Sequence, residues 1–461
     1  MKKNGIDMTS GNLFSKILIF AVPLALSGIL QLLYNAADLI ICELFSEVDS
    51  TAAISSTNSL TNLIITLFMG LSVGANVLVA RYYGEKNKER AQEVVYTSMI
   101  LSLIVGVVIG IFGFIFSSTF LKWMNTPDDV IDLSSTYLKI YFLGLPFSMI
   151  YNFGSALFRA VGDTKKPFIF LAVSGLFNVL FNLLFVIVFD MDVDGVALGT
   201  IISQGISALL VILALFRYKG FFNFNLKEMK FSVEAAIDIA KIGIPSGIQG
   251  VIFSISNVMI QSSVNDLGTD VMGGSGASNS LEGFIYTAMN SVAQASVAFV
   301  SANYGAGNKK NIKKVFLYSL FYVFCMNIIM GSIVLVLENF LLGLYVDSEA
   351  AIEAGRQRIR MIALTYFLCG FMDVGAQSSR GLGYSIRPTI ISMCGVCGIR
   401  LLWVFVIFKL DSFHNLNGLV ISYPISWLLT AALQAISFAV AYKKLNFDVK
   451  IANESLEAIQ A

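Results

Sequence analysis

Twelve long apolar stretches are the feature that most restricts how this chain can fold. A helix that crosses a bilayer needs about 20 mostly apolar residues, because backbone N–H and C=O groups in hydrocarbon must hydrogen-bond within their own segment. Such stretches lie at 17–42, 60–80, 94–117, 137–158, 168–189, 195–216, 239–262, 280–302, 316–337, 361–379, 389–408 and 417–442. The sequence therefore predicts an all-α integral membrane protein with twelve transmembrane helices.

The composition agrees with a membrane environment and argues against several classes of function. Of the 461 residues, 56% are hydrophobic and 13% are charged, whereas soluble proteins carry about 25% charged residues. The net charge of +1 offers no general attraction for nucleic acid. A single histidine, His414, argues against a histidine-based metal centre or catalytic triad. We expect a protein that is not an enzyme and has no resident cofactor or metal.

Basic residues predict how the chain is oriented in the membrane. Most of the 31 Lys and Arg residues fall in short loops on one predicted side. Cytoplasmic loops are enriched in Lys and Arg, so this side is expected to be the cytoplasm, with both termini in it. The cluster Arg356, Arg358 and Arg360 falls on the opposite side, where we attribute it to side chains that reach the membrane interface.

The chain is an internal duplication. FRAVGDTKKP at 158–167 reappears as SRGLGYSIRP at 379–388, an interval of 221 residues, and Asn35 and Asn257 match at an interval of 222. Each repeat holds six predicted spans, so both repeats enter the membrane in the same orientation. This predicts two six-helix bundles related by a pseudo-two-fold axis along the membrane normal, as in some secondary transporters. The expected divisions are 1–218 for the first bundle, 219–241 for a cytoplasmic linker and 242–461 for the second bundle.

Asp38 is an ionisable residue inside the first predicted span. Charge at the bilayer centre costs about 2.5–3.5 kcal/mol on insertion scales, so such groups usually face a cavity and have a function. Its carboxylate could exchange a proton or bind Na⁺ through oxygen. Asn178 and Asn182 lie four apart on one helix face, and their amide oxygens could complete a cation site. The alternatives are an acid at the outer membrane interface and asparagines that only bond neighbouring helices.

The second repeat has three further ionisable residues within its spans, Glu282, Asp373 and Arg400. Either acid could bind a cationic substrate or could pair with Arg400. Three more polar residues within spans are candidates for the substrate cavity, namely Gln31, Tyr34 and Asn257. The Cys394-x-x-Cys397 pattern has no second pair nearby, so we interpret it as packing and not as a redox or zinc motif.

Several motifs, in order and in both halves, carry a resemblance to a known family. They occupy Leu33–Phe45, Gly70–Asn87, Ala156–Pro167, Gly243–Gly250, Asn279–Asn290, Ser301–Asn308 and Ser379–Gly383. Over nearly its whole length the chain resembles the multidrug and toxic compound extrusion (MATE) transporters of bacteria. It looks most similar to the DinF- and MepA-type branch.

The resemblance implies a cation-coupling site in the first bundle. Asp38, Asn178 and Thr200 match the positions used by DinF-type members, whereas Asn182 replaces that branch's second aspartate. The acids used by NorM-type members are absent, because Phe253 and Cys369 stand at those positions. Asp373 lies one helical turn from Cys369 and could substitute for the second of these acids.

Taken together, these features predict an antiporter that exports organic, often cationic and lipophilic, compounds in exchange for Na⁺ or H⁺ by alternating access. The alternative is a flippase for lipid-linked oligosaccharides or other precursors, a function that would need a cationic cavity. The expected partners are small organic cations and the lipid bilayer, with no nucleic acid. The expected form is a monomer in the bacterial plasma membrane.

Overall fold

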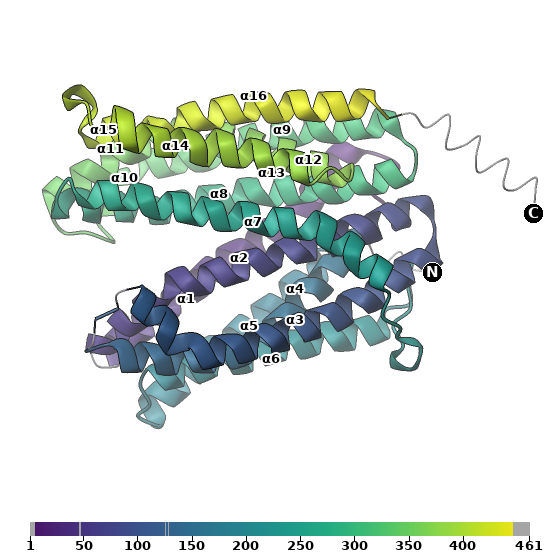
Figure 1. The fold of residues 1–461 in the computed structure, drawn as a ribbon, viewed down its shortest axis with the longest axis horizontal. Helices are drawn as coiled ribbons and strands as arrows, with labels where there is room; N and C mark the ends of the chain where they lie inside the picture. The colour runs from purple at the N-terminus through teal and green to yellow at the C-terminus, as the bar shows by residue number, and fades with distance from the viewer. Residues whose placement is uncertain (1–4, 46–47, 125, 128, 446–461) are drawn as a thin grey trace, which may run out of the picture. The chain divides into compact units, whose positions relative to one another are not determined.

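The computed structural model describes residues 5–45, 48–124, 126–127 and 129–445, and over these residues it is nearly all helical (Figure 1). The first repeat contains α1 (Leu13–Phe45), α2 (Val48–Glu85), α3 (Lys88–Trp123), α4 (Ile131–Ala160), α5 (Lys165–Leu183), the π-helix η1 (Leu184–Val188) and α6 (Val193–Arg217). A short 3₁₀ turn, η2 (Leu226–Glu228), follows.

The second repeat is more often interrupted than the first. Its elements are α7 (Val233–Asn265), α8 (Thr269–Gly305), α9 (Lys309–Val336), α10 (Glu338–Leu342), α11 (Glu349–Thr365), α12 (Phe367–Gly381), α13 (Ile386–Ser392), η3 (Met393–Gly398), α14 (Ile399–Leu402), η4 (Trp403–Ile407), η5 (Asp411–Phe413), α15 (Leu416–Val420) and α16 (Ser422–Lys443). Two of these, η3 and η4, are π-helices on either side of the short α14.

The helices agree with the predicted spans. Over the described residues, ten helices are long and apolar enough to cross a membrane, and α11 with α12 adds an eleventh that is bent by 46°. The remaining predicted span, 280–302, lies in α8, a 37-residue helix that does not pass this test. Many of its residues are small or polar and are buried in the bundle, so they need no apolar surface toward lipid. With α8 included, the twelve predicted stretches are all helical.

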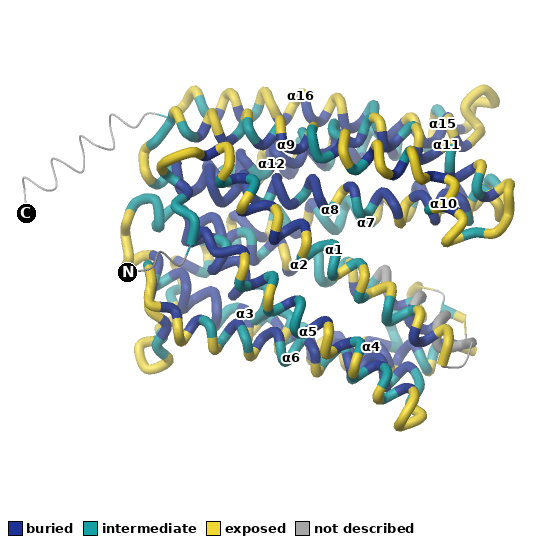
Figure 2. Tube along the Cα trace, turned by 180° about the vertical axis from the view of Figure 1, so that it is seen from behind, coloured by how far each residue is buried: buried dark blue, intermediate teal, exposed yellow. Residues whose placement is uncertain are grey.

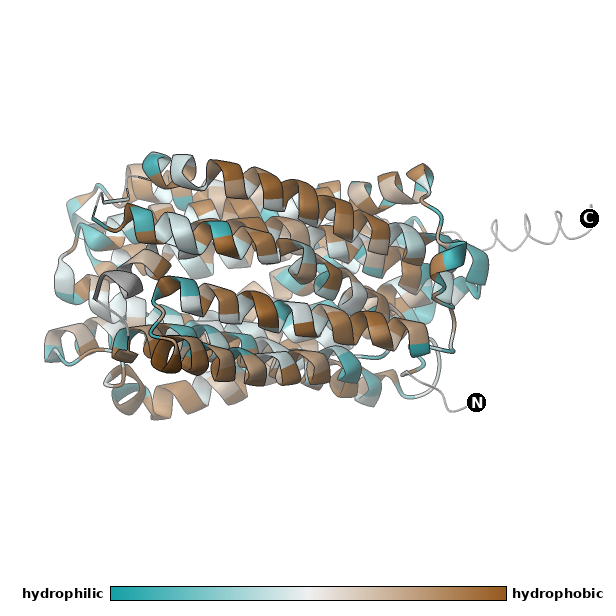
Figure 3. Cartoon of the chain, turned by 90° about the horizontal axis from the view of Figure 1, so that it is seen from below, coloured by the Kyte–Doolittle hydropathy of each residue, from teal (hydrophilic) through white to brown (hydrophobic). Residues whose placement is uncertain are grey.

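Large apolar side chains cover the outer faces of the helices. Figure 2 shows exposed residues recurring along the helices, and Figure 3 shows that much of the helical length is hydrophobic whereas the loops are more hydrophilic. On α3, glycines are buried at Gly106, Gly110 and Gly113. The same helix also carries exposed apolar residues, namely Leu103, Ile104, Val108, Ile111 and Ile115. Such an exposed apolar face suits lipid and not water.

Two compact units divide the chain, and neither is continuous in sequence. The first comprises Met1–Ile6, Val22–Val79 and Lys88–Val251, and the second comprises Asp7–Ala21, Ala80–Asn87 and Ile252–Ala461. These bounds differ from the expected division at 219–241, because α1, α2 and α7 each contribute residues to both units. In the first unit α4 packs against α3 and α6, and in the second α8 packs against α9, α11 and α12.

Side chains of the second unit hold the segment that precedes α1. The Asn303 Nδ2 of α8 donates to the Met8 carbonyl oxygen at 2.8 Å, and the Asn311 Nδ2 of α9 donates to the Thr9 carbonyl oxygen at 2.8 Å. The Tyr322 hydroxyl donates to the Phe14 carbonyl oxygen at 2.8 Å. These long-range hydrogen bonds explain why the first residues of α1 belong to the second unit, although they begin the first repeat.

The repeated motif at 158–167 and 379–388 encodes the same helix end twice. Gly162 has φ +84° and Gly383 has φ +91°, a left-handed conformation that side chains other than glycine rarely adopt. The Gly162 N–H donates to the Arg159 carbonyl oxygen at 3.0 Å, and the Gly383 N–H donates to the Arg380 carbonyl oxygen at 2.8 Å. Both glycines therefore end their helices, α4 and α12, by the same hydrogen bond.

A second pair of matched glycines allows the ends of α2 and α8 to touch within the second unit. A Cβ atom on Gly84 would lie 1.9 Å from the Ala302 carbonyl oxygen, and one on Gly305 would lie 1.9 Å from the Arg81 carbonyl oxygen. Both obstacles are backbone atoms, which cannot move without separating the helices.

Gly84→Ala is expected to lower the stability of the protein by about 1–3 kcal/mol, the usual cost of overpacking. The measurement is the midpoint of thermal unfolding of the purified protein in detergent. Gly276→Ala in α8 is the matched control, because no atom lies within 4 Å of its added Cβ. It is expected to leave the midpoint unchanged or slightly raised. Equal midpoints for the two variants would contradict the close crossing of α2 and α8.

Candidate functional site

Four residues predicted from the sequence meet within the first unit. Asn182 on α5 donates from Nδ2 to the Oδ1 atom of Asp38 on α1 at 2.6 Å. Asn178, one turn earlier on α5, donates from Nδ2 to the Thr200 hydroxyl of α6 at 3.4 Å, and also interacts with Asp38. Thr200 in turn donates to the Val196 carbonyl oxygen at 3.0 Å. Helices α1, α5 and α6 thus bring one carboxylate, two amides and one hydroxyl together.

Both asparagines leave a buried oxygen without a hydrogen-bond partner. Asn178 Oδ1 and Asn182 Oδ1 are buried and accept no hydrogen bond from any residue that the structure describes. The orientation of Asn182 follows from Asp38, because a carboxylate only accepts and must face the Nδ2 group. Buried acceptors without a donor cost free energy, and a cation bound beside them would relieve that cost.

The oxygen atoms suit a monovalent hard cation. They supply one negative charge together with neutral amide and hydroxyl oxygens, the ligand types that hard cations prefer. Within the described ranges, no group of three or more His, Cys, Asp or Glu residues could hold a metal ion. One carboxylate with neutral oxygens matches the single positive charge of Na⁺ or a proton.

Three features around this site were not predicted from the sequence. Gly199 on α6 gives Asn182 its room, because a Cβ atom there would lie 2.1 Å from Asn182 Oδ1. The π-helix η1 begins two residues after Asn182, and π-helical turns are frequent at functional sites. Tyr137 and Tyr141 on α4, with stacked rings 6.2 Å apart, interact electrostatically with Asp38. In the sequence, the one-turn spacing of Tyr137 and Tyr141 was the signal that could have pointed to these two residues.

The other candidates on α1 lie near Asp38 in sequence but differ in their surroundings. The Tyr34 hydroxyl donates to the Ala172 carbonyl oxygen of α5 at 3.2 Å, and the Tyr34 ring occupies the space that a Cβ atom on Gly175 would fill. Tyr34 therefore links α1 to α5. Gln31 is exposed, and no other residue in the described part of the chain hydrogen-bonds its side chain.

Glu282 pairs with Arg358 and not with Arg400, the partner considered from the sequence. Arg358 on α11 donates from Nε to Glu282 Oε1 at 2.7 Å and from Nη2 to Oε2 at 3.0 Å. Ser278 also donates to Glu282 Oε1, at 3.0 Å, and Arg358 Nη1 donates to Ser275 at 2.9 Å. The two charged side chains are 4% and 3% exposed, so the pair lies inside the helix bundle.

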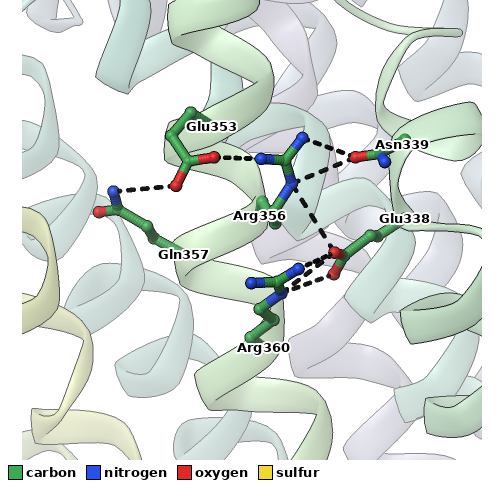
Figure 4. A network of polar contacts seen from close by, with 6 residues as sticks. All are labelled: Glu338, Asn339, Glu353, Arg356, Gln357 and Arg360. Atoms are coloured by element: carbon green, nitrogen blue, oxygen red, sulfur yellow. Dashed lines mark hydrogen bonds and ion pairs between the residues drawn. The ribbon is translucent and has the colours of Figure 1, made fainter.

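This pair also corrects the interpretation of the cluster Arg356, Arg358 and Arg360 as interfacial. Arg358 is buried, whereas its neighbours tie α11 to α10, as Figure 4 shows. Arg360 donates from Nε to Glu338 at 3.0 Å, and Arg356 donates from Nη2 to Asn339 at 2.7 Å and pairs with Glu353. Their one-turn spacing places the outer two on one polar face of α11, which sequence alone did not reveal because Glu338 lies on another helix.

Asp373 likewise has partners other than Arg400. The Tyr286 hydroxyl of α8 donates to the Asp373 carboxylate of α12, and Arg380 attracts it electrostatically. Asp373 is buried and interacts electrostatically with Cys369, one turn away. Arg400 on α14 instead donates to Asn257 on α7 and Ser426 on α16, both at 3.2 Å. The second unit therefore separates the acids that sequence reasoning placed beside Arg400.

Comparison with known proteins gives a consistent match. The family model MatE matches residues 23–184 and again 245–406, so each repeat matches separately. The probable multidrug resistance protein YoeA of Bacillus subtilis is 26% identical over 437 residues, covering 92% of this chain and 93% of that protein. The multidrug export protein MepA of Staphylococcus aureus is 22% identical over 422 residues, covering 91% of this chain and 92% of that protein.

Solved structures share the fold of the whole chain. The outward-facing conformation of a multidrug resistance MATE family transporter aligns with a TM-score of 0.91 at 20% identity, covering 97% of this chain and 100% of that one. A MATE crystal structure in the straight conformation aligns with a TM-score of 0.89 at 20% identity, over 96% of this chain and 100% of that chain. The fold of twelve transmembrane helices in two bundles is thereby confirmed.

Proposed function

Because this chain belongs to the MatE family of multidrug efflux transporters, we propose that it is an antiporter that exports organic compounds in exchange for Na⁺ or H⁺. The proposed substrates are lipophilic and often cationic. We place it in the plasma membrane of a bacterium, as a monomer with both termini in the cytoplasm. The observation that carries the coupling proposal is the Asp38 carboxylate in contact with Asn178 and Asn182, whose buried amide oxygens have no hydrogen-bond partner among the described residues.

The geometry supports a coupling mechanism in which Na⁺ and the proton compete for the single negative charge of Asp38. When Asp38 is ionised, Na⁺ would be held by its carboxylate, and the Asn182 amide would have to turn for its oxygen to join, because it faces Asp38 with Nδ2 in this structure. When Asp38 is protonated, its charge is gone and its carboxyl group gains a donor, while its carbonyl oxygen can still accept from the Asn182 amide. Either event changes the hydrogen bonds that join α1 to α5 and α6. A ligand that binds two conformations unequally shifts their populations, and this is how ion binding would drive export.

Asp38 is the only acid in this set of contacts, since Asn182 stands where DinF-type members are expected to have a second aspartate. A single carboxylate holds Na⁺ less tightly than two, because the charge term is smaller. A proton needs only the one carboxylate. The coupling ion therefore has to be decided by measurement under separate gradients.

The function is tested with the purified full-length protein in lipid vesicles loaded with ethidium, a lipophilic cation. An inward Na⁺ or H⁺ gradient is imposed separately, and dye movement is followed by fluorescence. We expect one gradient to accelerate export several-fold over the rate without a gradient, and the matching ionophore to remove that acceleration. Export that responds to neither gradient would contradict antiport.

The alternative of a precursor flippase remains second. It would need a cationic cavity for pyrophosphate, and two of the buried arginines of the second unit interact with acids, Arg358 with Glu282 and Arg380 with Asp373. Among the buried arginines of this unit that the structure describes, that leaves Arg400, and a single guanidinium is too few to neutralise a pyrophosphate.

A further inference from the structure

Arg400 is a buried cation with an unusual set of partners. It is 5% exposed, and it donates from Nε to the Ser426 hydroxyl at 3.2 Å and from Nη1 to Asn257 Oδ1 at 3.2 Å. Its guanidinium carbon lies 4.1 Å from the ring centre of Tyr423 and 5.6 Å from that of Trp427. All of these residues belong to the second unit.

The guanidinium keeps unused donors. It has five N–H groups, of which the two hydrogen bonds use two. Within the described part of the chain, Nη2 of Arg400 makes no hydrogen bond, and Arg400 forms no ion pair with an acid. Asn257, which accepts from Nη1, is itself an exposed residue. The residue that Nη1 contacts therefore lies at the surface of its unit.

The other buried charges that the structure describes in this unit each have a partner of opposite charge. Glu282 pairs with Arg358, Glu338 pairs with Arg360, and Asp373 interacts with Arg380. Contact with two aromatic rings compensates Arg400 only in part, since a cation–π contact is worth about 0.5–2 kcal/mol. Neutral partners such as serine and asparagine offer dipoles and no charge. A buried cation that remains uncompensated is costly, and one that serves a function is the expected exception.

The position of Arg400 repeats that of the ion site in the first unit. Arg400 follows Asn178 by 222 residues, the interval that also separates Asn35 from Asn257 and the starts of the two MatE matches. Asn178 lies on α5, the fifth span of the first repeat, and contacts α6, the sixth. Arg400 lies on α14, which is part of the fifth span of the second repeat, and contacts α16 of the sixth span. A π-helix follows Asn178 at η1, and η3 and η4 flank Arg400.

The two repeats differ in charge at this site, because Arg400 takes the place of the neutral Asn178, and the charge of the first unit comes from Asp38 on α1. The first unit presents a carboxylate with neutral amides, and the second presents a guanidinium with a neutral amide and a hydroxyl. A residue needed only to join α7 to α16 would not require a charge, because a neutral amide could bond Asn257 and Ser426 without the cost of burying an ion.

We propose that Arg400, oriented by Asn257 and Ser426, binds an oxyanion of the transported compound, a carboxylate in the simplest case. The inference rests on the proposed export function and extends its substrates from cationic to zwitterionic amphiphiles. The planar guanidinium of Arg400 matches the two oxygens of a carboxylate. The ring faces of Tyr423 and Trp427 pack against this guanidinium and hold it in place.

Two dyes that differ only in this group test the proposal. The probes are a rhodamine with a free carboxylate and the methyl ester of the same rhodamine. Binding to the full-length protein in phosphatidylcholine vesicles is measured by fluorescence polarisation without any ion gradient. In Arg400→Gln we expect the Kd for the free acid to rise about tenfold or more, while the Kd for the ester changes less than about twofold.

Two further variants guard against a misfolded protein. Arg400→Lys keeps the charge without the fork and is expected to bind the free acid with intermediate affinity. Asn257→Ala removes an exposed partner of Arg400, so the fold should remain intact. It is expected to raise the Kd for the free acid a few-fold and to leave the Kd for the ester unchanged. If these variants weaken the binding of both dyes equally, or of neither dye, the proposal is overturned and Arg400 has a structural role.

A lipid phosphate is the competing source of an oxyanion. If Arg400→Gln changes the response of the protein to phosphatidylglycerol in the vesicles and leaves the free-acid preference intact, the occupant is a lipid headgroup and the proposal is wrong. Binding and export are measured separately. A protein that discriminates the dyes through Arg400 but responds to neither ion gradient would refute antiport while supporting this inference.

Discussion

Asp38→Asn is expected to abolish ion-driven export while the protein remains folded and inserted. The substitution keeps the shape of the side chain and an oxygen that accepts the 2.6 Å hydrogen bond from Asn182, so α1 and α5 stay joined. It removes the one negative charge of the site. Two unit charges 4 Å apart interact by about 4 kcal/mol at an effective dielectric of 20, which corresponds to roughly a thousandfold in cation affinity.

The measurement is dye export from vesicles under the gradient that drives the native protein. The rate of the Asp38→Asn variant should fall to that of vesicles without protein. Asp238→Asn is a matched control, because Asp238 is a surface acid on α7 that pairs with Lys241, and it should export at the native rate. Size-exclusion profiles of both variants show whether they are folded. Undiminished export by the Asp38 variant would remove Asp38 from the coupling mechanism.

Breaking the pair between Glu282 and Arg358 is expected to destabilise the protein more than any surface substitution. Both side chains are almost fully buried and share two hydrogen bonds, so Glu282→Gln leaves a buried guanidinium without its charge partner. Removing one member of a buried ion pair typically costs about 3–5 kcal/mol. Replacing both, as Glu282→Gln with Arg358→Met, removes the unpaired charge and should recover much of the loss.

Thermal unfolding in detergent compares the single variants, the double variant and a surface control. Arg90→Ala serves as the control, because Arg90 and its partner Glu93 are substantially exposed, and such pairs contribute about 0–1 kcal/mol. The expected order of midpoints is native and Arg90→Ala highest, the double variant next, and the single variants lowest. A Glu282→Gln midpoint equal to that of Arg90→Ala would show that the pair does not stabilise the fold.

Much of the architecture could be read from the sequence because it depends on local patterns. Apolar length alone predicts helices in a bilayer, and the matched motifs predict the duplication that the family model then matched twice. The spacing of Asn178 and Asn182 puts both on one face of α5, and the shared MATE motifs indicated Asp38 and Thr200 as their neighbours. Their contacts are observed, and their role in coupling stays a prediction.

Tertiary structure decided which charges meet. The sequence placed Glu282, Asp373 and Arg400 within predicted spans, where either acid could have paired with Arg400. The rotation of α11 about its axis and its packing against α8 instead place Arg358 on Glu282, and α14 turns Arg400 toward α7 and α16. Partners of this kind are tens of residues apart, and their choice depends on helix rotation and crossing, which hydropathy and spacing do not record.

The sequence by itself therefore determined that this protein lies in a membrane, where its helices are, that it is an internal duplication, and which acid is most worth testing. Each of these follows from properties carried within one helix or one motif. The exchange of segments between the two units, the Glu282–Arg358 pair and the uncompensated Arg400 were decided only by the tertiary structure. All three depend on how separate helices pack against one another, as α2 and α8 do at Gly84 and Gly305, and a buried charge finds its partner only after that packing.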